Sequence, residues 1–164
     1  MWRIQRFRKK LIKVLDKKKI KYYSCIKELN IDNNKLYFLQ TKEYDNENDN
    51  SSVIYFQYLH STFLFMGDVS IAREADILNM YDLGKIDFLK VGHHGSDTSS
   101  SEKFIHTIQP KYTLVSVGKN NKYGHPKESV LKKLKNSKIY RTDLDGSVEI
   151  ILNKNGFKLK TYSS

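Results

Sequence analysis

Cysteine and long apolar runs are what this 164-residue sequence most lacks. Its single cysteine, Cys25, excludes an internal disulfide framework and any cysteine-based zinc motif. No stretch approaches the roughly 18 consecutive apolar residues that a membrane-spanning helix requires. A metal bound by this chain would therefore have histidine, aspartate or other oxygen ligands.

Acidic residues are also scarce, since 18 aspartates and glutamates face 29 lysines and arginines and leave a formal net charge of +11. Most of the excess lies in residues 1–21, which contain ten basic residues and one acid, Asp16. This segment lacks the apolar centre of a signal peptide, so we expect a soluble, cytoplasmic chain. Two interpretations of the segment stay open: a surface that attracts polyanions, or a solvated helix face.

What is present suits one folded domain, because 39% of the residues are hydrophobic and 12% are aromatic. Alternating apolar residues predict strands, and apolar residues at helical spacing predict helices. The expected strands span residues 35–42, 52–60, 62–66, 86–91, 112–117, 138–141, 147–153 and 157–162. The expected helices span residues 3–19, 72–83, 100–109 and 126–135. This order of elements predicts a layered α/β architecture.

Turn dipeptides predict how the strands at the C-terminus are connected. Asp145-Gly146 and Asn155-Gly156 are strong hairpin signals, so the last three strands should form a β-meander. A turn near His60 should likewise join residues 52–60 and 62–66 into a hairpin whose second strand ends just before a carboxylate.

The first helix has an apolar stripe between its basic residues. Phe7, Leu11 and Val14 recur at helical spacing. We expect them to pack against the sheet while the lysines and arginines face water.

Metal-competent side chains follow three of the predicted strands, at the point where each strand ends. They are Asp68 in FLFMGD, His93 and His94 in FLKVGHHGS, and His125 in GKNNKYGHP. Ligands gather at the carboxyl ends of strands in α/β sheets, so these side chains should converge at one rim of the sheet. A glycine beside each lets the backbone turn sharply and approach a ligand closely.

Each of these residues also has a purely structural explanation. An aspartate after glycine is often a turn former or a helix N-cap, and His125 before Pro126 suits the start of a helix. Two adjacent imidazoles at a buried strand end are harder to explain, because burying them without partners is costly. The three segments together therefore indicate a site. His60 and His106 are expected in a hairpin turn and on a helix surface.

These segments resemble the C-terminal metallo-β-lactamase-like domain of ComEC-type competence proteins, a family associated with DNA uptake. The resemblance rests on Gly67-Asp68, KVGHHGS, PKYTLVSVGKNNKYGHP and YRTDLDG, with NDNSSVIYF upstream, and covers roughly residues 35–152. It implies the C-terminal portion of a metallo-β-lactamase-like αββα sandwich. It also implies a divalent-metal hydrolase site that acts on a phosphodiester such as DNA.

The resemblance further implies a role for each residue of the site. Asp68 would bridge two metal ions and His94 would be the last metal-binding histidine, with zinc or manganese as the metal. His93 would orient its neighbour or the substrate. His125 would hold a phosphate oxygen or pass a proton, which makes both residues catalytic. Two further residues would contact the substrate: Ser96 and Asn121.

The main metal motif of the superfamily, His-x-His-x-Asp-His, is absent from this sequence. Residues 1–164 therefore predict a single, incomplete domain that is inactive alone and needs a polypeptide supplying the N-terminal half. Without that half, an apolar face or sheet edge should be uncovered. The alternative hypothesis is a non-catalytic basic module that binds nucleic acid or a partner protein through its first helix.

Overall fold

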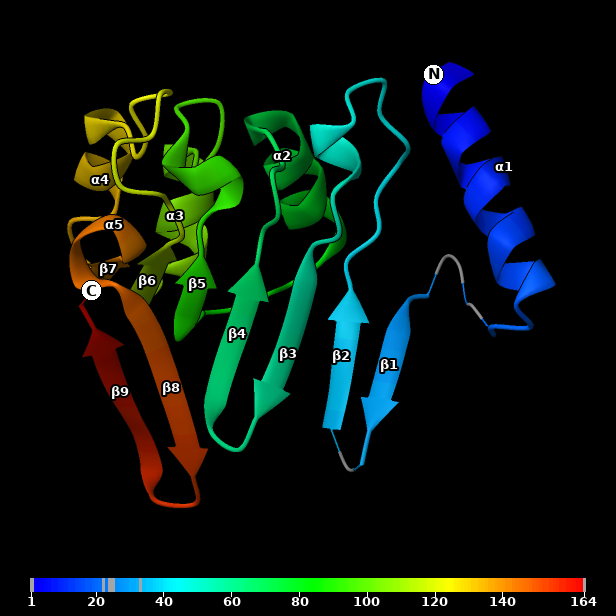
Figure 1. The fold of residues 1–164 in the computed structure, drawn as a ribbon. Helices are drawn as coiled ribbons and strands as arrows, with labels where there is room; N and C mark the ends of the chain where they lie inside the picture. The colour runs from blue at the N-terminus through cyan, green and yellow to red at the C-terminus, as the bar shows by residue number, and fades with distance from the viewer. Residues whose placement is uncertain (1, 22, 24–25, 33, 164) are drawn as a thin grey trace.

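The computed structural model describes residues 2–21, 23, 26–32 and 34–163, with the backbone alone for residues 2–8. Within these residues, a seven-stranded sheet has its strands side by side in chain order, and a two-stranded ribbon follows it (Figure 1). The sheet strands are β1 (Glu28–Ile31), β2 (Asn34–Phe38), β3 (Ile54–Tyr58), β4 (Ser61–Phe65), β5 (Phe88–Lys90), β6 (Tyr112–Val115) and β7 (Lys138–Arg141). The ribbon strands are β8 (Ser147–Asn153) and β9 (Gly156–Tyr162).

Two modes of pairing divide the sheet at β4. The strands β1 to β4 pair antiparallel, and β3 and β4 form a hairpin in which Tyr58 faces Ser61 across a tight turn. The strands β4 to β7 pair parallel, which requires a crossover between successive strands. The crossovers contain α2 (Ile71–Met80), α3 (Glu102–Ile108) and α4 (Glu128–Lys133). The predicted α/β architecture and the hairpin before Asp68 are therefore confirmed.

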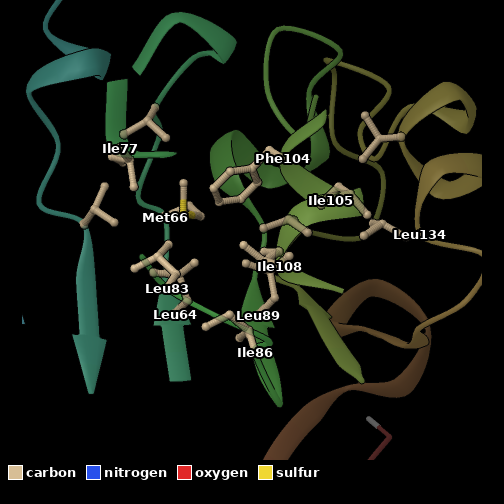
Figure 2. Packing of buried hydrophobic residues seen from close by; sticks show 14 of the residues in the cluster. Leu64, Met66, Ile77, Leu83, Ile86, Leu89, Phe104, Ile105, Ile108 and Leu134 are labelled. Atoms are coloured by element: carbon tan, nitrogen blue, oxygen red, sulfur yellow. The ribbon is translucent and has the colours of Figure 1, made fainter. Parts of the chain in front are cut away.

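The main hydrophobic core lies between the sheet and these helices. Leu64 of β4 and Leu89 of β5, which are 0% and 1% exposed, belong to it. Ile77 of α2 and Phe104 and Ile108 of α3 lie in the same cluster (Figure 2). A slip of one residue in either strand would turn its buried side chains to the other face, so this core fixes the register of β4 and β5. It thereby also fixes where each strand ends.

The opposite face of the sheet has a row of aromatic rings. Phe56, Phe63, Phe88 and Tyr112, from β3 to β6, stack in turn with centroid separations of 4.6, 4.8 and 5.1 Å. Phe157 of β9 meets the rings of Phe88 and Tyr112 edge-on at 4.9 and 5.1 Å. The ribbon thus covers part of this face as the start of a second layer. The complete αββα sandwich stays a prediction.

The C-terminal strands do not form the predicted meander. β7 pairs with β6 in the parallel sheet, and β8 pairs with β9 rather than with β7. Between β7 and β8 the chain makes the helical turn α5 (Thr142–Asp145). The Asp145 carboxylate accepts the backbone N–H of Arg141 at 2.7 Å, which stabilises this turn in place of a hairpin. The hairpin prediction at Asp145-Gly146 is therefore wrong, whereas Asn155-Gly156 does close the β8–β9 hairpin.

The first helix, α1 (Trp2–Lys17), stands beyond the β1 edge instead of lying on the sheet (Figure 1). Leu11 and Val14 are 46% and 50% exposed, so the predicted packing is wrong for both. The side chain of Phe7 lies outside the described residues. In the described part of the chain, no helix combines the length and the apolar character needed to cross a bilayer.

The segment after α1 holds a strand that the sequence did not predict. The strand β1 has only four residues, all of them exposed, so its alternation of polar and apolar side chains is too short to predict a strand. The neighbouring strand, expected over residues 35–42, ends at Phe38. The chain then runs to a short 3-10 turn, η1 (Asn48–Asn50), before it enters β3.

Candidate functional site

Three strand ends bring the predicted site residues together at one rim of the sheet. Asp68 follows β4, His93 and His94 belong to the 3-10 turn η2 (Gly92–Gly95) after β5, and His125 lies in the loop after β6. His94 Nε2 lies 3.8 Å from Asp68 Oδ1. The centroid of the His93 ring lies 6.4 Å from that of His94 and 6.0 Å from that of His125. The predicted convergence is confirmed, while the chemical roles stay predictions.

The backbone fixes the tautomer of the neutral His94 ring. Its Nδ1 lies 2.7 Å from the carbonyl oxygen of Ser116, just after β6. A carbonyl oxygen can only accept, so Nδ1 has the proton and Nε2 presents a lone pair on the side of Asp68. Metal-binding histidines commonly donate their other N–H to a carbonyl in this way. Two ligands, each about 2.0–2.2 Å from one zinc ion, lie at most about 4.4 Å apart, so the 3.8 Å separation suits a shared ion.

The two adjacent histidines both adopt left-handed backbone conformations, with φ of 46° at His93 and 55° at His94. This conformation is rare outside glycine and costs on the order of 1–2 kcal/mol per residue. The turn is held by the N–H of His93, which donates to the carbonyl of Gly67 at 2.9 Å. The bond joins the end of β5 to the end of β4, so Asp68 and the histidine pair are positioned by the same contact.

Two glycines allow the close approaches that build the rim. Gly67 has a φ of +61°, and a Cβ there would lie 2.7 Å from the Cβ of Ser51. The Ser51 hydroxyl in turn accepts the backbone N–H of Asp68 at 3.2 Å. Gly95 has a φ of +82°, and a Cβ there would lie 2.6 Å from the Cβ of Pro126. Only glycine at this position lets η2 pack directly on Pro126. This close packing brings the loop that contains His125 to the site.

His125 has a buried nitrogen, Nδ1, with no hydrogen-bond partner among the described residues. Burial lowers the pKa of His125, and the neighbouring Lys127, His93 and His94 lower it further. The ring is therefore neutral at pH 7 and can accept a proton. Asn121 holds the loop in place, because its side-chain oxygen accepts the His125 N–H at 2.8 Å and its Nδ2 donates to the His125 carbonyl at 2.7 Å. Its predicted contact with substrate is untested.

Ser96 lies beneath the rim with 5% of its surface exposed. Its hydroxyl pairs with that of Thr98 at 3.0 Å and accepts the Thr98 N–H at 3.3 Å. The Thr98 hydroxyl lies 3.4 Å from Nδ1 of His93. Ser96 therefore supports a residue that contacts His93, and its direct contact with substrate stays a prediction. Thr98 was not predicted from the sequence, where its only signal is its place in GSDTSSS beside the histidines.

Lys90 is a second neighbour of the site that was not predicted, although it lies within KVGHHGS. Its side chain is partly buried and donates to the carbonyl of Val91 at 3.2 Å. Burial lowers the pKa of Lys90, and the attraction of the Asp68 carboxylate partly opposes this shift. A cation held near Asp68 adds positive charge at this rim.

The ligand set at the rim is incomplete. Across the described residues, no group of three or more His, Cys, Asp or Glu side chains is arranged to hold a metal ion. Asp68 and His94 could supply two ligands, and their side chains are 42% and 48% exposed, so groups from another polypeptide can reach them. A catalytic zinc has three protein ligands and an open position. The other two histidines stand as predicted: His60 is in the β3–β4 turn and His106 is exposed on α3.

These observations define a class of protein. It is an α/β protein with a carboxylate and imidazoles at the carboxyl ends of the strands of its sheet. The sequence is similar to a stretch of three known proteins. It is 37% identical to ComE operon protein 3 of Bacillus subtilis over 105 residues, which cover 63% of this chain and 14% of the relative. It is 35% identical to competence protein ComA of Neisseria gonorrhoeae over 127 residues, 74% of this chain and 18% of the relative.

The third protein is recombination protein 2 of Haemophilus influenzae, with 34% identity over 106 residues, 63% of this chain and 13% of the relative. No protein-family model matches the sequence. The chain is thus similar to a stretch of each of these three proteins, one of which is named a competence protein. It spans less than a fifth of the length of each of these relatives.

Proposed function

We propose that this chain is the C-terminal portion of a metal-dependent hydrolase domain of the ComEC competence type, directed at phosphodiesters and inactive alone. The observation that supports it most is the pairing of Asp68 and His94, 3.8 Å apart, with the His94 tautomer fixed by the Ser116 carbonyl. The name of one relative, competence protein ComA, connects the chain to competence, and we extend that connection to DNA uptake.

Each residue of the rim has a defined part in this proposal. Asp68 and His94 would hold a divalent zinc or manganese ion, which lowers the pKa of bound water and polarises a phosphoryl oxygen. His93, held by its contact with Thr98, would orient the substrate. His125, neutral because burial lowers its pKa, would accept a proton or donate a hydrogen bond to a phosphate oxygen.

The chain alone would be inactive, because two ligands do not complete a catalytic metal site. The remaining ligands would come from a polypeptide that carries His-x-His-x-Asp-His. Such a polypeptide would approach the rim where Asp68 and His94 are exposed. It would also cover the aromatic face of the sheet beyond the ribbon.

The test compares hydrolysis of bis(p-nitrophenyl) phosphate with manganese or zinc, by the chain alone and mixed with a His-x-His-x-Asp-His polypeptide. That polypeptide can be the segment directly preceding the matched stretch in the Bacillus subtilis relative, if it has the motif. We expect turnover only in the mixture, abolished by Asp68→Ala and kept with Asp45→Ala, an exposed acid in the loop before η1.

Two outcomes would contradict the proposal. Turnover by the chain alone that Asp68→Ala abolishes would show that the described ligands suffice and that the domain is complete. A stable complex of the two polypeptides that binds metal and hydrolyses no phosphodiester would exclude the hydrolase function.

A further inference from the structure

A basic groove runs along α3 and α4 and extends to the amino ends of β5, β6 and β7. It has a volume of about 890 Å³ and is lined by residues of α3 and α4 and by the segments that precede β5, β6 and β7. Lys85 and Lys111 stand just before β5 and β6, whereas His93 and His125 follow those strands. The groove therefore extends to the amino ends of the strands, and its lining shares no residue with the rim site.

The groove is strongly positive. Five lysines line it against a single acid, Glu102, and the lysines are Lys85, Lys111, Lys132, Lys133 and Lys135. Two of the lysines have carboxylate partners, since Lys111 pairs with Asp87 at 2.6 Å and Lys132 with Glu128 at 3.0 Å. Lys133 donates to the carbonyl of Ser100 at 3.1 Å.

The remaining two lysines are available to a ligand. Among the described residues, Lys85 and Lys135 are exposed and have no carboxylate partner. Between the lysines, the groove is lined by the buried residues Ile105, Pro110 and Leu134, which form an apolar floor. A floor of this kind with lysines along its edges suits a chain of phosphates whose sugars and bases can rest on apolar atoms.

We propose that this groove binds the phosphodiester backbone of a nucleic acid strand without regard to its sequence. Lysine ammonium groups contact phosphates as point charges, and the described lining has no arginine fork that would read the edge of a base. The proposal is independent of the hydrolase function, because it uses none of the rim residues. It also differs from the hypothesis that α1 is the nucleic-acid-binding element.

The experiment measures binding of the full chain to a fluorescein-labelled oligothymidylate of about 20 nucleotides by fluorescence anisotropy, at several salt concentrations. The groove variant has Lys85→Gln, Lys132→Gln and Lys135→Gln. Its matched control has Lys27→Gln, Lys154→Gln and Lys158→Gln, three exposed lysines elsewhere with the same reduction in charge. Circular dichroism confirms that both variants fold.

We expect the groove variant to bind at least about tenfold more weakly. The log–log slope of its affinity against salt should fall by about 0.7 for each phosphate that the removed lysines no longer neutralise. The control should bind like the natural chain. Three outcomes overturn the proposal: no binding by the natural chain, equal weakening in both variants, or binding that is abolished only when Lys9, Lys10 and Lys13 of α1 are changed to Gln.

Discussion

The strained pair of histidines is the residue-level feature that folding alone explains least. His93 and His94 both have positive φ, although neither lies in the core, since His94 is exposed and His93 is partly buried. Non-glycine residues keep such conformations mainly where the surrounding structure imposes them, and these positions cluster at functional sites. The strain supports an interpretation in which the turn is selected for presenting two imidazoles at the rim.

Replacing His93 with glycine should therefore raise the free energy of unfolding by about 1 kcal/mol, because glycine adopts a φ of 46° without strain. Urea denaturation followed by circular dichroism measures the change. The matched control is His106→Gly, which lies within a helix and should lower the free energy of unfolding by up to about 1 kcal/mol. A comparable decrease in His93→Gly would mean that the contact with Thr98 outweighs the strain.

At the level of elements, one buried carboxylate joins two helices. Glu74 of α2 is 1% exposed, and its two carboxylate oxygens accept the backbone N–H groups of Ser100 and Ser101 at 2.5 and 2.8 Å. These donors lie at the start of α3, where the helix cannot satisfy them itself. Burial raises the pKa of Glu74, and the two N–H groups oppose that shift. The contact fixes the segment that runs from the histidine turn into α3.

The substitution Glu74→Gln should lower the free energy of unfolding by about 1–3 kcal/mol. A glutamine amide keeps one acceptor but turns its NH₂ group toward a backbone N–H, so one buried donor is left without its partner. Thermal or urea unfolding measures the decrease, and the exposed Glu43→Gln should change the free energy by no more than about 0.5 kcal/mol. Equal stabilities for the two variants would show that the carboxylate is not needed to hold α3.

The sequence alone was sufficient to predict those elements that a local pattern of residues marks. The β3–β4 hairpin, the crossover helices and the three polar strand ends were predicted because apolar alternation and glycine placement mark them directly. The convergence of Asp68 and His94 followed from the rule that parallel strands share a carboxyl edge. The Ser116 carbonyl and Thr98 could not be predicted, because their contacts with the histidines depend on loop conformation.

The errors arose where pairing depends on distant partners. The Asp145-Gly146 dipeptide is a hairpin signal, yet the carboxylate bonds to the N–H of Arg141 and makes a helical turn instead. The apolar stripe of α1 predicted packing, but Leu11 is 46% exposed. Burial cannot be inferred from periodicity alone, because the same stripe suits contact with a partner outside the chain.

At the scale of the whole molecule, the lysine groove and the rim site are separate features of the surface. The rim site, with Asp68 and three histidines, lies at the carboxyl ends of the parallel strands, and the lysine groove runs along α3 and α4 to their amino ends. The groove is thus suited to retaining a strand near the site while leaving the rim free.

The net charge of +11 also predicts how the stability of the chain responds to salt. Like charges repel one another most strongly in the compact state, so the excess of lysine and arginine destabilises the fold when screening is weak. Raising sodium chloride from about 10 to about 150 mM shortens the screening length from about 30 to about 8 Å. The melting temperature should rise by about 2–4 °C, which corresponds to about 1 kcal/mol in a chain of this size.

Differential scanning fluorimetry in the two salt concentrations measures this rise. The groove variant with Lys85→Gln, Lys132→Gln and Lys135→Gln has three fewer positive charges, so its melting temperature should be higher than that of the natural chain at low salt and should respond less to added salt. The two chains should converge near 150 mM, where the repulsion is screened in both. A melting temperature that falls with salt would show that attractive pairs such as Lys111–Asp87 outweigh the repulsion of the excess charge.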